Sequence, residues 1–292
     1  MIESQDIPVI AIDGGGTRCR IAYFDGKATT VAESGCANVS TGFDAAINEI
    51  ERGLELLAER TGVSRASLCA LPAFVGLAGV MGGEIADRVV ARLPFEKLRV
   101  EDDRRAALRG ALGGRDGIVA HCGTGSFFAL QVAGTMHLAG GWGPVVGDEA
   151  SAQWIGRHAL GIVLKAIDGR LESSAMSERI GAEYDGPADI VRFAGAASPS
   201  EFGRLAPLVT ELARNGDPLA CRVMQRGADE IAASLRNLGW TRGLAICLTG
   251  GIGPHFAPFL PEYMAANVAA PAGGPLTGAI SLAQDFAREG RR

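Results

Sequence analysis

The chain has 292 residues, of which 47% are hydrophobic and 21% are charged, and its formal net charge is −5. This length and composition allow one large domain or two ordinary ones with a sizeable core, and they argue against long disorder. The acidic balance argues against nucleic-acid binding as a class. No apolar run approaches the roughly 20 residues of a membrane span. The N-terminus leaves no room for a signal peptide, so we expect a cytoplasmic protein without membrane or nucleic-acid partners.

The six cysteines are scattered along the chain, and no two of them have C-x-x-C spacing. They are Cys19, Cys36, Cys69, Cys122, Cys221 and Cys247. This spacing does not support a zinc knuckle or a redox motif, and it favours reduced thiols in or near the core.

The first part of the chain predicts short strands joined by tight turns, followed by alternating helices and strands. Apolar residues at spacings of 4, 3, 4 and 3 between Phe43 and Leu57 mark one face of a helix. We expect strands at 9–12, 18–24, 29–33, 73–77 and 98–100, and helices at 43–57, 84–93 and 104–112.

After Gly113-Gly114 a similar pattern begins again, so the sequence predicts two α/β lobes, 1–115 and 116–292, with a cleft between them. Asp217-Pro218 is a strong helix start, whereas 170–205 carries no clear pattern. The last helix is a candidate to pack back on the first lobe. We expect strands at 118–121, 127–132, 136–138 and 244–248, and helices at 149–168, 218–238 and 277–288.

A glycine-rich turn, Asp13-Gly14-Gly15-Gly16-Thr17, follows the first apolar strand. Glycines let consecutive backbone N–H groups point at an anion, and the threonine adds a hydroxyl donor. The carboxylate can hold a hydrated Mg²⁺ that binds phosphate. The turn is not a Walker A loop and does not open a helix. It suits a metal-nucleotide, and the alternative is a hairpin turn with a solvated aspartate.

Two further small-residue loops also follow apolar strands. They are Gly123-Thr124-Gly125-Ser126 and Thr249-Gly250-Gly251-Ile252-Gly253. The first suits phosphate, and the second suits a base or ribose lying against the backbone. Each signal is weak alone, but three such loops are hard to explain as coincidental turns.

The order of the three loops resembles the actin/hexokinase/Hsp70 ATPase superfamily over nearly the whole chain. The resemblance implies two ribonuclease H-like (actin-like ATPase) lobes around ATP and Mg²⁺. It implies phosphate contacts from the first two loops, adenosine contacts from Gly250 and Gly251, and a metal contact from Asp13.

Four longer segments make the match sharper. They are "GCANVSTG" (35–42), "VGLAGV" (75–80), "VEDDRRAALRGA" (100–111) and "GGWGPVVGDEASAQWIG" (140–156). The last is similar to a G-G-W-G-x-x-x-G-D-E-G-S-A pattern of the family that holds N-acetylglucosamine kinase, bacterial glucosamine kinases and the BadF/BadG/BcrA/BcrD-type ATPases. The resemblance implies transfer of the γ-phosphoryl group of Mg-ATP to the 6-hydroxyl of N-acetylglucosamine or glucosamine. It leaves the choice between the two sugars open.

The same resemblance implies a catalytic base at Asp103, which also contacts the sugar. Phosphoryl transfer needs mainly orientation of the attacking oxygen and charge neutralisation, so one carboxylate suffices for this role. The alternatives are that Asp103 only caps the helix that follows it, and that the adjacent Asp102 is the base instead.

The remaining sugar contacts implied by the resemblance are Asn38, Gly79, Gly141, Trp142 and Asp148. Asn38 can donate and accept, Asp148 accepts from hydroxyls, and Gly141 and Trp142 form a floor under the ring. The respective alternatives are an αL turn at Asn38, a helix cap at Asp148 and plain core packing of Trp142.

Ala150, in the last of these segments, and His121-Cys122, directly before Gly123, need separate interpretation. Ala150 stands where the family pattern has glycine, which removes a position tolerant of positive φ and leaves the placement of that turn in doubt. We expect Cys122 to pack in the core and His121 to be a buried, hydrogen-bonded histidine.

Two other functions stay open from the sequence. One is an ATPase activator of a radical dehydratase or reductase, which would bridge a [4Fe–4S] cluster between subunits with paired cysteines. The other is a sugar-binding regulator on a kinase fold. A repressor/glucokinase (ROK-type) protein is disfavoured because its zinc-binding cysteine cluster is missing. A homodimer is the oligomer that the family suggests.

Overall fold

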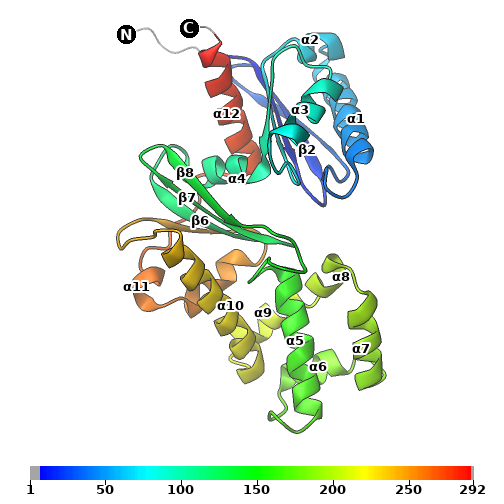
Figure 1. The fold of residues 1–292 in the computed structure, drawn as a ribbon, viewed down its shortest axis with the longest axis vertical. Helices are drawn as coiled ribbons and strands as arrows, with labels where there is room; N and C mark the ends of the chain where they lie inside the picture. Colours follow the sequence, from blue (N-terminus) through cyan, green and yellow to red (C-terminus); the bar gives the residue numbers. More distant parts are fainter. Residues whose placement is uncertain (1–6, 291–292) are drawn as a thin grey trace. The chain divides into compact units, whose positions relative to one another are not determined.

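The computed structural model describes residues 7–290 and divides the chain into two compact units. The first unit combines the chain up to Gly114 with the segment from Ala272 onward, and the second is Arg115–Pro271. Each unit is an α/β structure built on its own sheet (Figure 1). The predicted α/β class is therefore confirmed.

The first unit has a five-stranded mixed sheet in the order β3-β2-β1-β4-β5. Tight turns join β1, β2 and β3, which pair antiparallel, whereas β1, β4 and β5 are parallel because helices cross between them. The strands are β1 (Val9–Gly14), β2 (Cys19–Phe24), β3 (Thr29–Ser34), β4 (Ala73–Leu77) and β5 (Leu98–Asp102). The helices are α1 (Phe43–Thr61), α2 (Arg65–Cys69), α3 (Gly83–Arg92), α4 (Asp103–Leu112) and α12 (Pro275–Glu289).

Both faces of this sheet are covered. Along β1, Ile10 and Ile12 face one cluster with α1, and Val9 and Ala11 face another with α4 and α12. This explains why β1 reads as one continuous apolar run.

The helices α4 and α12 pack closely because glycines line their contact. A Cβ atom on Gly278 would lie 2.0 Å from the carbonyl oxygen of Ala106. A Cβ on Gly110 would lie 2.1 Å from the carbonyl oxygen of Gly274. The last helix thus belongs to the first unit by direct backbone contact.

The second unit has a four-stranded sheet in the order β8-β7-β6-β9, with β6 and β9 parallel and the other pairs antiparallel. The strands are β6 (Gly117–Cys122), β7 (Ser126–Val132), β8 (Thr135–Gly140) and β9 (Ile246–Thr249). The longer helices are α5 (Ala152–Ile167), α7 (Pro187–Ala196), α9 (Ala206–Arg214) and α10 (Pro218–Asn237). The shorter ones are α6 (Ala175–Gly181), α8 (Pro199–Gly203), the 3-10 helix η1 (Gly253–Phe259) and α11 (Glu262–Ala265).

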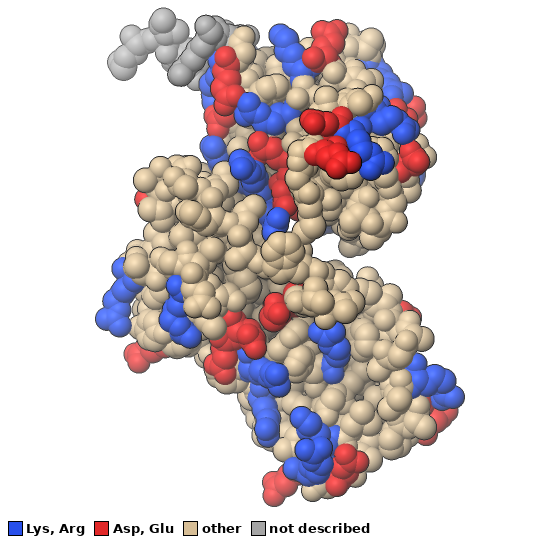
Figure 2. Space-filling model, viewed as in Figure 1, with Lys and Arg blue, Asp and Glu red and all other residues tan. Residues whose placement is uncertain are grey.

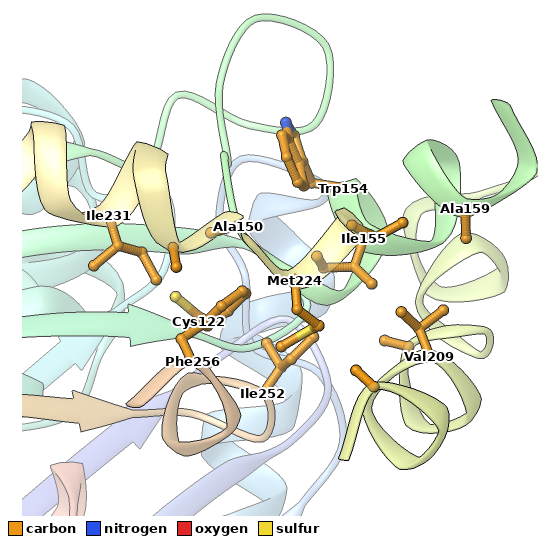
Figure 3. Close-up of a cluster of buried hydrophobic side chains, with 14 of the residues drawn as sticks. Cys122, Ala150, Trp154, Ile155, Ala159, Val209, Met224, Ile231, Ile252 and Phe256 are labelled. Atoms are coloured by element: carbon orange, nitrogen blue, oxygen red, sulfur yellow. The ribbon is translucent and has the colours of Figure 1, made fainter. Parts of the chain in front are cut away.

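The core of the second unit lies where β6, α5, α10 and η1 meet. Cys122 from β6, Ile155 from α5, Met224 from α10 and Phe256 from η1 pack together there (Figure 3). Cys122 is fully buried, which confirms its predicted packing role.

The segment 170–205, for which the sequence shows no clear pattern, contains α6, α7 and α8. Local signals were present: Ser174 and Ser198 both form capping boxes, and Pro199 follows Ser198 at the first helical position. The helix expected from 149 begins at Ala152 instead. The helix start at Asp217 is confirmed, because its carboxylate accepts from the backbone N–H groups of the two residues after Pro218.

Within residues 7–290, no helix has the length and apolar character that a membrane crossing requires.

Candidate functional site

The predicted site residues of the first unit gather at one edge of its sheet. The parallel strands β1, β4 and β5 end at Gly14, Leu77 and Asp102, and these ends lie side by side. The glycine turn, Gly79 and Asp103 follow directly after those ends. Loops at the carboxyl ends of parallel strands are the usual place for ligands in such sheets.

Backbone hydrogen bonds join the loops at this edge. The N–H of Ala78 donates to the oxygen of Gly14 at 2.8 Å, and the N–H of Ala37 donates to the oxygen of Gly15 at 3.0 Å. The N–H of Val39 donates to the oxygen of Ala78 at 3.1 Å. The structure therefore brings the glycine turn, the asparagine loop and the turn after β4 into one network, with Gly16 and Thr17 exposed.

Asn38 is held in a fixed orientation. Its Oδ1 accepts from the N–H of Ser40 at 2.9 Å and from the Ser40 hydroxyl at 2.7 Å. A Cβ on Gly79, whose φ is +87°, would lie 2.7 Å from the same oxygen. The φ angle of Asn38 is not positive, so the αL alternative for this residue is wrong. The Nδ2 group makes no hydrogen bond within residues 7–290 and is available to a ligand.

The two aspartates at the start of α4 have different environments. Asp102 caps the helix by accepting from the N–H of Arg104 at 2.9 Å, and the Arg104 guanidinium binds both of its carboxylate oxygens. Asp103 is the first helical residue. The helix-cap alternative for Asp103 is therefore wrong, because Asp102 has that role.

The partly buried Asp103 has a raised pKa. Burial, the negative charge of Asp102 with its hydrogen bond, and the charge of Asp13 raise the pKa of Asp103 to about 7, against the opposing effect of Arg104. A carboxylate with this pKa can accept a proton near neutral pH.

Asp13 lies opposite Arg20 in the β1–β2 pairing. Both Arg20 nitrogens donate to Oδ2 of Asp13, at 3.1 Å from Nε and 2.5 Å from Nη2. The second oxygen, Oδ1, is free of this ion pair and is available for a cation.

In the second unit, two glycine loops and the start of α5 meet. The N–H of Ala152 donates to the oxygen of Gly123 at 2.8 Å, and the N–H of Ile252 donates to the oxygen of Cys122 at 3.0 Å. A Cβ on Gly250 would lie 2.3 Å from that Cys122 oxygen. The loop that carries Thr124 is thus in contact with the loop after β9.

His121 adds a side-chain link between the same two loops. Its Nδ1 lies 3.1 Å from the Thr249 hydroxyl, and its ring stacks on Phe127 at 4.9 Å between centroids. Burial lowers the pKa of His121 to about 4. It is therefore a neutral, hydrogen-bonded histidine, as expected.

Asp148 is buried beside the loop after β6. A Cβ on Gly125 would lie 2.8 Å from its Oδ2. Burial raises the pKa of Asp148, while hydrogen bonds from the backbone of Ser126 and Gly143 oppose that shift. The cap of α5 is Ser151, whose hydroxyl oxygen accepts from the backbone of the third helical residue. The helix-cap alternative for Asp148 is therefore wrong.

The segment around Asp148 has strained backbone. Asp148 and Ala150 have φ angles of +57° and +61°, which non-glycine residues rarely adopt. Ala150 thus keeps the left-handed conformation that glycine would favour, although its methyl group is fully buried. The replacement of glycine in the motif has not removed the turn.

Trp142 is exposed over 64% of its surface, and Val145 and Val146 in the same segment are exposed over 86% and 78%. Core packing of Trp142 is therefore wrong. The adjacent Gly141 has a φ of +73°. This segment places three large apolar side chains on the surface of the second unit.

A pocket of about 670 Å³ opens beside the two glycine loops of the second unit. Gly123, Thr124, Ala152, Gly251 and His255 form part of its lining. Ile252 lines it as well, and the rest comes from α8, α9 and the link between them, which sequence reasoning missed: Gly203, Ala206, Pro207, Thr210, Glu211 and Arg214. Only the amphipathic spacing of α9 could have indicated that helix, and nothing in the sequence pointed to its contact with the loops.

The chain is similar to several sugar kinases. It is 27% identical to glucosamine kinase GspK of Vibrio cholerae over 94% of this chain and 95% of that protein. It is 29% identical to the N-acetylmuramic acid/N-acetylglucosamine kinase of Clostridium acetobutylicum over 78% of each chain. A Chromobacterium violaceum structure, provisionally assigned as an N-acetylglucosamine kinase, is 32% identical with a TM-score of 0.84, over 94% of this chain and 98% of that one.

More distant structures share the fold alone. The activator of 2-hydroxyisocaproyl-CoA dehydratase from Clostridium difficile is 13% identical, with a TM-score of 0.51 over 98% of this chain and 97% of that one. The family model for the BadF/BadG/BcrA/BcrD ATPases matches residues 10–269. The chain therefore belongs to the BadF/BadG/BcrA/BcrD ATPase family.

Proposed function

We propose that this protein is an ATP-dependent amino-sugar kinase, which transfers the γ-phosphoryl group of ATP to the 6-hydroxyl of glucosamine or N-acetylglucosamine. The observation that carries the proposal is the carboxylate pair at the start of α4. Arg104 binds the carboxylate of Asp102, while Asp103 has a pKa of about 7 at the end of a parallel sheet edge. The sugar kinases named above support the substrate class.

In this proposal, Asp103 is the base that accepts the proton of the attacking sugar hydroxyl. A base works best when its pKa lies near the operating pH, because it is then both deprotonated and basic. Asp102 is the positioning residue, since it caps α4 and raises the pKa of Asp103 by its charge.

Asp13 fits the predicted Mg²⁺ site as a single carboxylate ligand. Mg²⁺ commonly takes one or two carboxylates, with phosphate oxygens and waters completing its six ligands. Within residues 7–290 no group of three His, Cys, Asp or Glu side chains could hold a metal alone, so the cation would arrive with the nucleotide. When bound, it would neutralise phosphate charge. Arg20 fixes Oδ2 of Asp13 and leaves Oδ1 for this purpose.

Each unit offers its own candidate nucleotide contacts. In the first, Gly14, Gly15, Gly16 and Thr17 offer backbone N–H groups and a hydroxyl. In the second, the phosphate contacts are Gly123, Thr124, Gly125 and Ser126, and the adenosine contacts are Gly250 and Gly251. The pocket of about 670 Å³ beside Gly251 is large enough for a nucleoside.

The proposed sugar contacts combine fixed acceptors with a fixed donor. The Nδ2 group of Asn38 donates, and the buried carboxylate of Asp148 accepts from hydroxyls. Gly79 keeps the asparagine loop in place by its close approach. Gly141 and Trp142 would form the floor under the sugar ring. A homodimer in the cytoplasm remains part of the proposal.

The burial of most cysteines disfavours the ATPase-activator function relative to the kinase function. Cys36 is exposed and Cys221 is half-buried, whereas the other four are buried. Burial raises the pKa of Cys19 and Cys122 to about 12, so these thiols are poor cluster ligands. A lone exposed cysteine does not make the pair that a subunit-bridging cluster needs.

The test is ADP release from Mg-ATP with glucosamine, N-acetylglucosamine, N-acetylmannosamine, N-acetylmuramic acid, glucose and no sugar. We expect release that depends on one amino sugar, which also names the substrate. Equal ADP release with and without sugar, or bound iron in anaerobically purified protein, would contradict the kinase function.

A further inference from the structure

A second pocket, of about 680 Å³, lies between α5 and α10, away from the glycine loops. Its volume lies in the range typical of small-molecule sites. Of the elements that line this second pocket, only α5 also contributes a residue to the lining of the first pocket. Apolar walls come from Ile162, Leu171 and Val223, and the rim is basic.

Four cations line this pocket. Arg157 and Lys165 come from α5, and Arg222 and Arg226 come from α10. Within residues 7–290, none of these four side chains makes an ion pair with a carboxylate. Figure 2 shows Lys and Arg side chains gathered over the region where Figure 1 draws α5 and α10. Cations without a carboxylate partner, on a chain of net charge −5, indicate a place where an anion is expected.

The cations converge on a shared space. His158 lines the same pocket. Burial lowers its pKa, and the positive charges of Arg226, Arg157 and Lys165 lower it further. Its ring stacks on Trp154 at 3.6 Å between centroids. The only acidic lining residue, Asp229, accepts from Gln225 at 2.9 Å.

Gly161 widens the pocket in the middle of α5. A Cβ atom at this position would meet nothing within 4 Å, and the φ angle is not positive. Alanine would therefore fit there and favour the helix. The absence of a side chain at this position leaves open volume between the cations.

We propose that the pocket between α5 and α10 binds a small phosphorylated metabolite, with a phosphate monoester at Arg157, Arg222 and Arg226 and a body of about hexose size against the apolar walls. Guanidinium groups match phosphate oxygens in a bidentate manner. The volume exceeds that of phosphate alone, and the apolar walls need a carbon skeleton.

The pocket is connected to the segment that carries Asp148. Nη1 of Arg157 donates to the carbonyl oxygen of Pro144 at 3.0 Å. An anion that recruits this guanidinium competes with that hydrogen bond. Binding of the phosphorylated metabolite would thus alter the 140–148 segment. An effect of this change on sugar affinity rests on the proposed function, whereas the binding of the metabolite does not.

The test is calorimetric titration of the full chain with glucose 6-phosphate in saturating AMPPNP, whose terminal phosphate blocks a sugar phosphate from the transfer site. We expect one site per chain, weakened at least tenfold in Arg222→Gln/Arg226→Gln and in Gly161→Leu. Gly161→Leu removes no charge, so a thermal midpoint at or above that of the wild type shows that its fold is intact. Arg236→Gln is the control for the loss of an arginine from α10 outside the pocket, and it removes one charge where the double variant removes two.

Equal affinity in the wild type and both pocket variants would overturn the proposal, as would no binding by the wild type. A second equivalent of AMPPNP that is lost in Gly161→Leu would also overturn it, because the pocket would then take a nucleotide. None of these results depends on kinase activity, so the proposed function can fail separately.

Discussion

Asp103 and Asp148 are both shielded carboxylates with raised pKa values, but the molecule produces the two shifts differently. For Asp103, burial acts together with the charges of Asp102 and Asp13. For Asp148, burial acts against hydrogen bonds from the backbone of Ser126 and Gly143. The first arrangement suits the base that we propose at Asp103, and the second suits the acceptor of sugar hydroxyls that we propose at Asp148.

The largest expected effect comes from Asp103→Asn. This change removes the base but keeps the size and hydrogen bonding of the side chain. We expect kcat to fall by about 100-fold or more, with nucleotide and sugar binding largely unchanged. Steady-state kinetics with a binding measurement checks this, and an unchanged kcat would remove Asp103 from the mechanism.

The pH profile is expected to follow the protonation of Asp103. Since the base must be deprotonated, kcat/KM of the wild type should fall about tenfold per unit as the pH drops below about 7.

Asp102→Asn sharpens this prediction. Asparagine still caps α4, but the substitution removes the charge that raises the pKa of Asp103. The inflection in the pH profile of kcat/KM should therefore move to lower pH. The conservative Glu101→Gln, in the same strand, is the control. If the Asp102→Asn inflection stayed near that of the wild type, Asp102 would not tune the base.

At the second carboxylate, Asp148→Ala should raise KM for the sugar about tenfold or more and leave KM for ATP unchanged. The loss of a charge-assisted hydrogen bond is worth about 1.5–3 kcal/mol. A change confined to ATP would mean that the two ligands are assigned to the wrong segments.

Gly125→Ala tests the role of the Asp148 carboxylate without replacing Asp148 itself. The new Cβ would lie 2.8 Å from Oδ2 of Asp148 and must displace it. We expect a smaller rise in KM for the sugar than in Asp148→Ala, together with a change in KM for ATP, because Gly125 is also a proposed phosphate contact. Gly114→Ala, where a Cβ meets nothing within 4 Å, is the control and should behave as the wild type.

The smallest effect is expected at Ala150. Glycine would relieve a left-handed backbone worth about 1 kcal/mol, but it removes a buried methyl group worth about 0.8 kcal/mol. Urea unfolding of Ala150→Gly should therefore match the wild type within about 1 kcal/mol. Ala150→Val should lose more than about 2 kcal/mol, because a β-branched residue at positive φ is strained in a packed site. Equal free energies of unfolding for Ala150→Gly and Ala150→Val would show that the backbone at this position is not strained.

The features that could be predicted best from the sequence are those that depend on residues close together in the chain. Strand ends, the glycine turns and the Asp217 cap are determined by neighbouring residues, and they were placed within a few positions. The assignment of the cap to Asp102 required the position of the Arg104 backbone N–H, and the raised pKa of Asp103 required its burial and the positions of Asp102 and Asp13 in space. The lining of the pocket by α9, with Thr210 and Arg214, depends on contacts across many residues, which no local pattern encodes.

The measurement that tests the account most directly is transfer of label from γ-labelled ATP to glucosamine or N-acetylglucosamine, compared between the wild type and Asp103→Asn. The account predicts labelled sugar 6-phosphate with the wild type, and formation slower by about 100-fold or more with the variant. Label that appears only as free phosphate, or transfer at the same rate in both proteins, would contradict it.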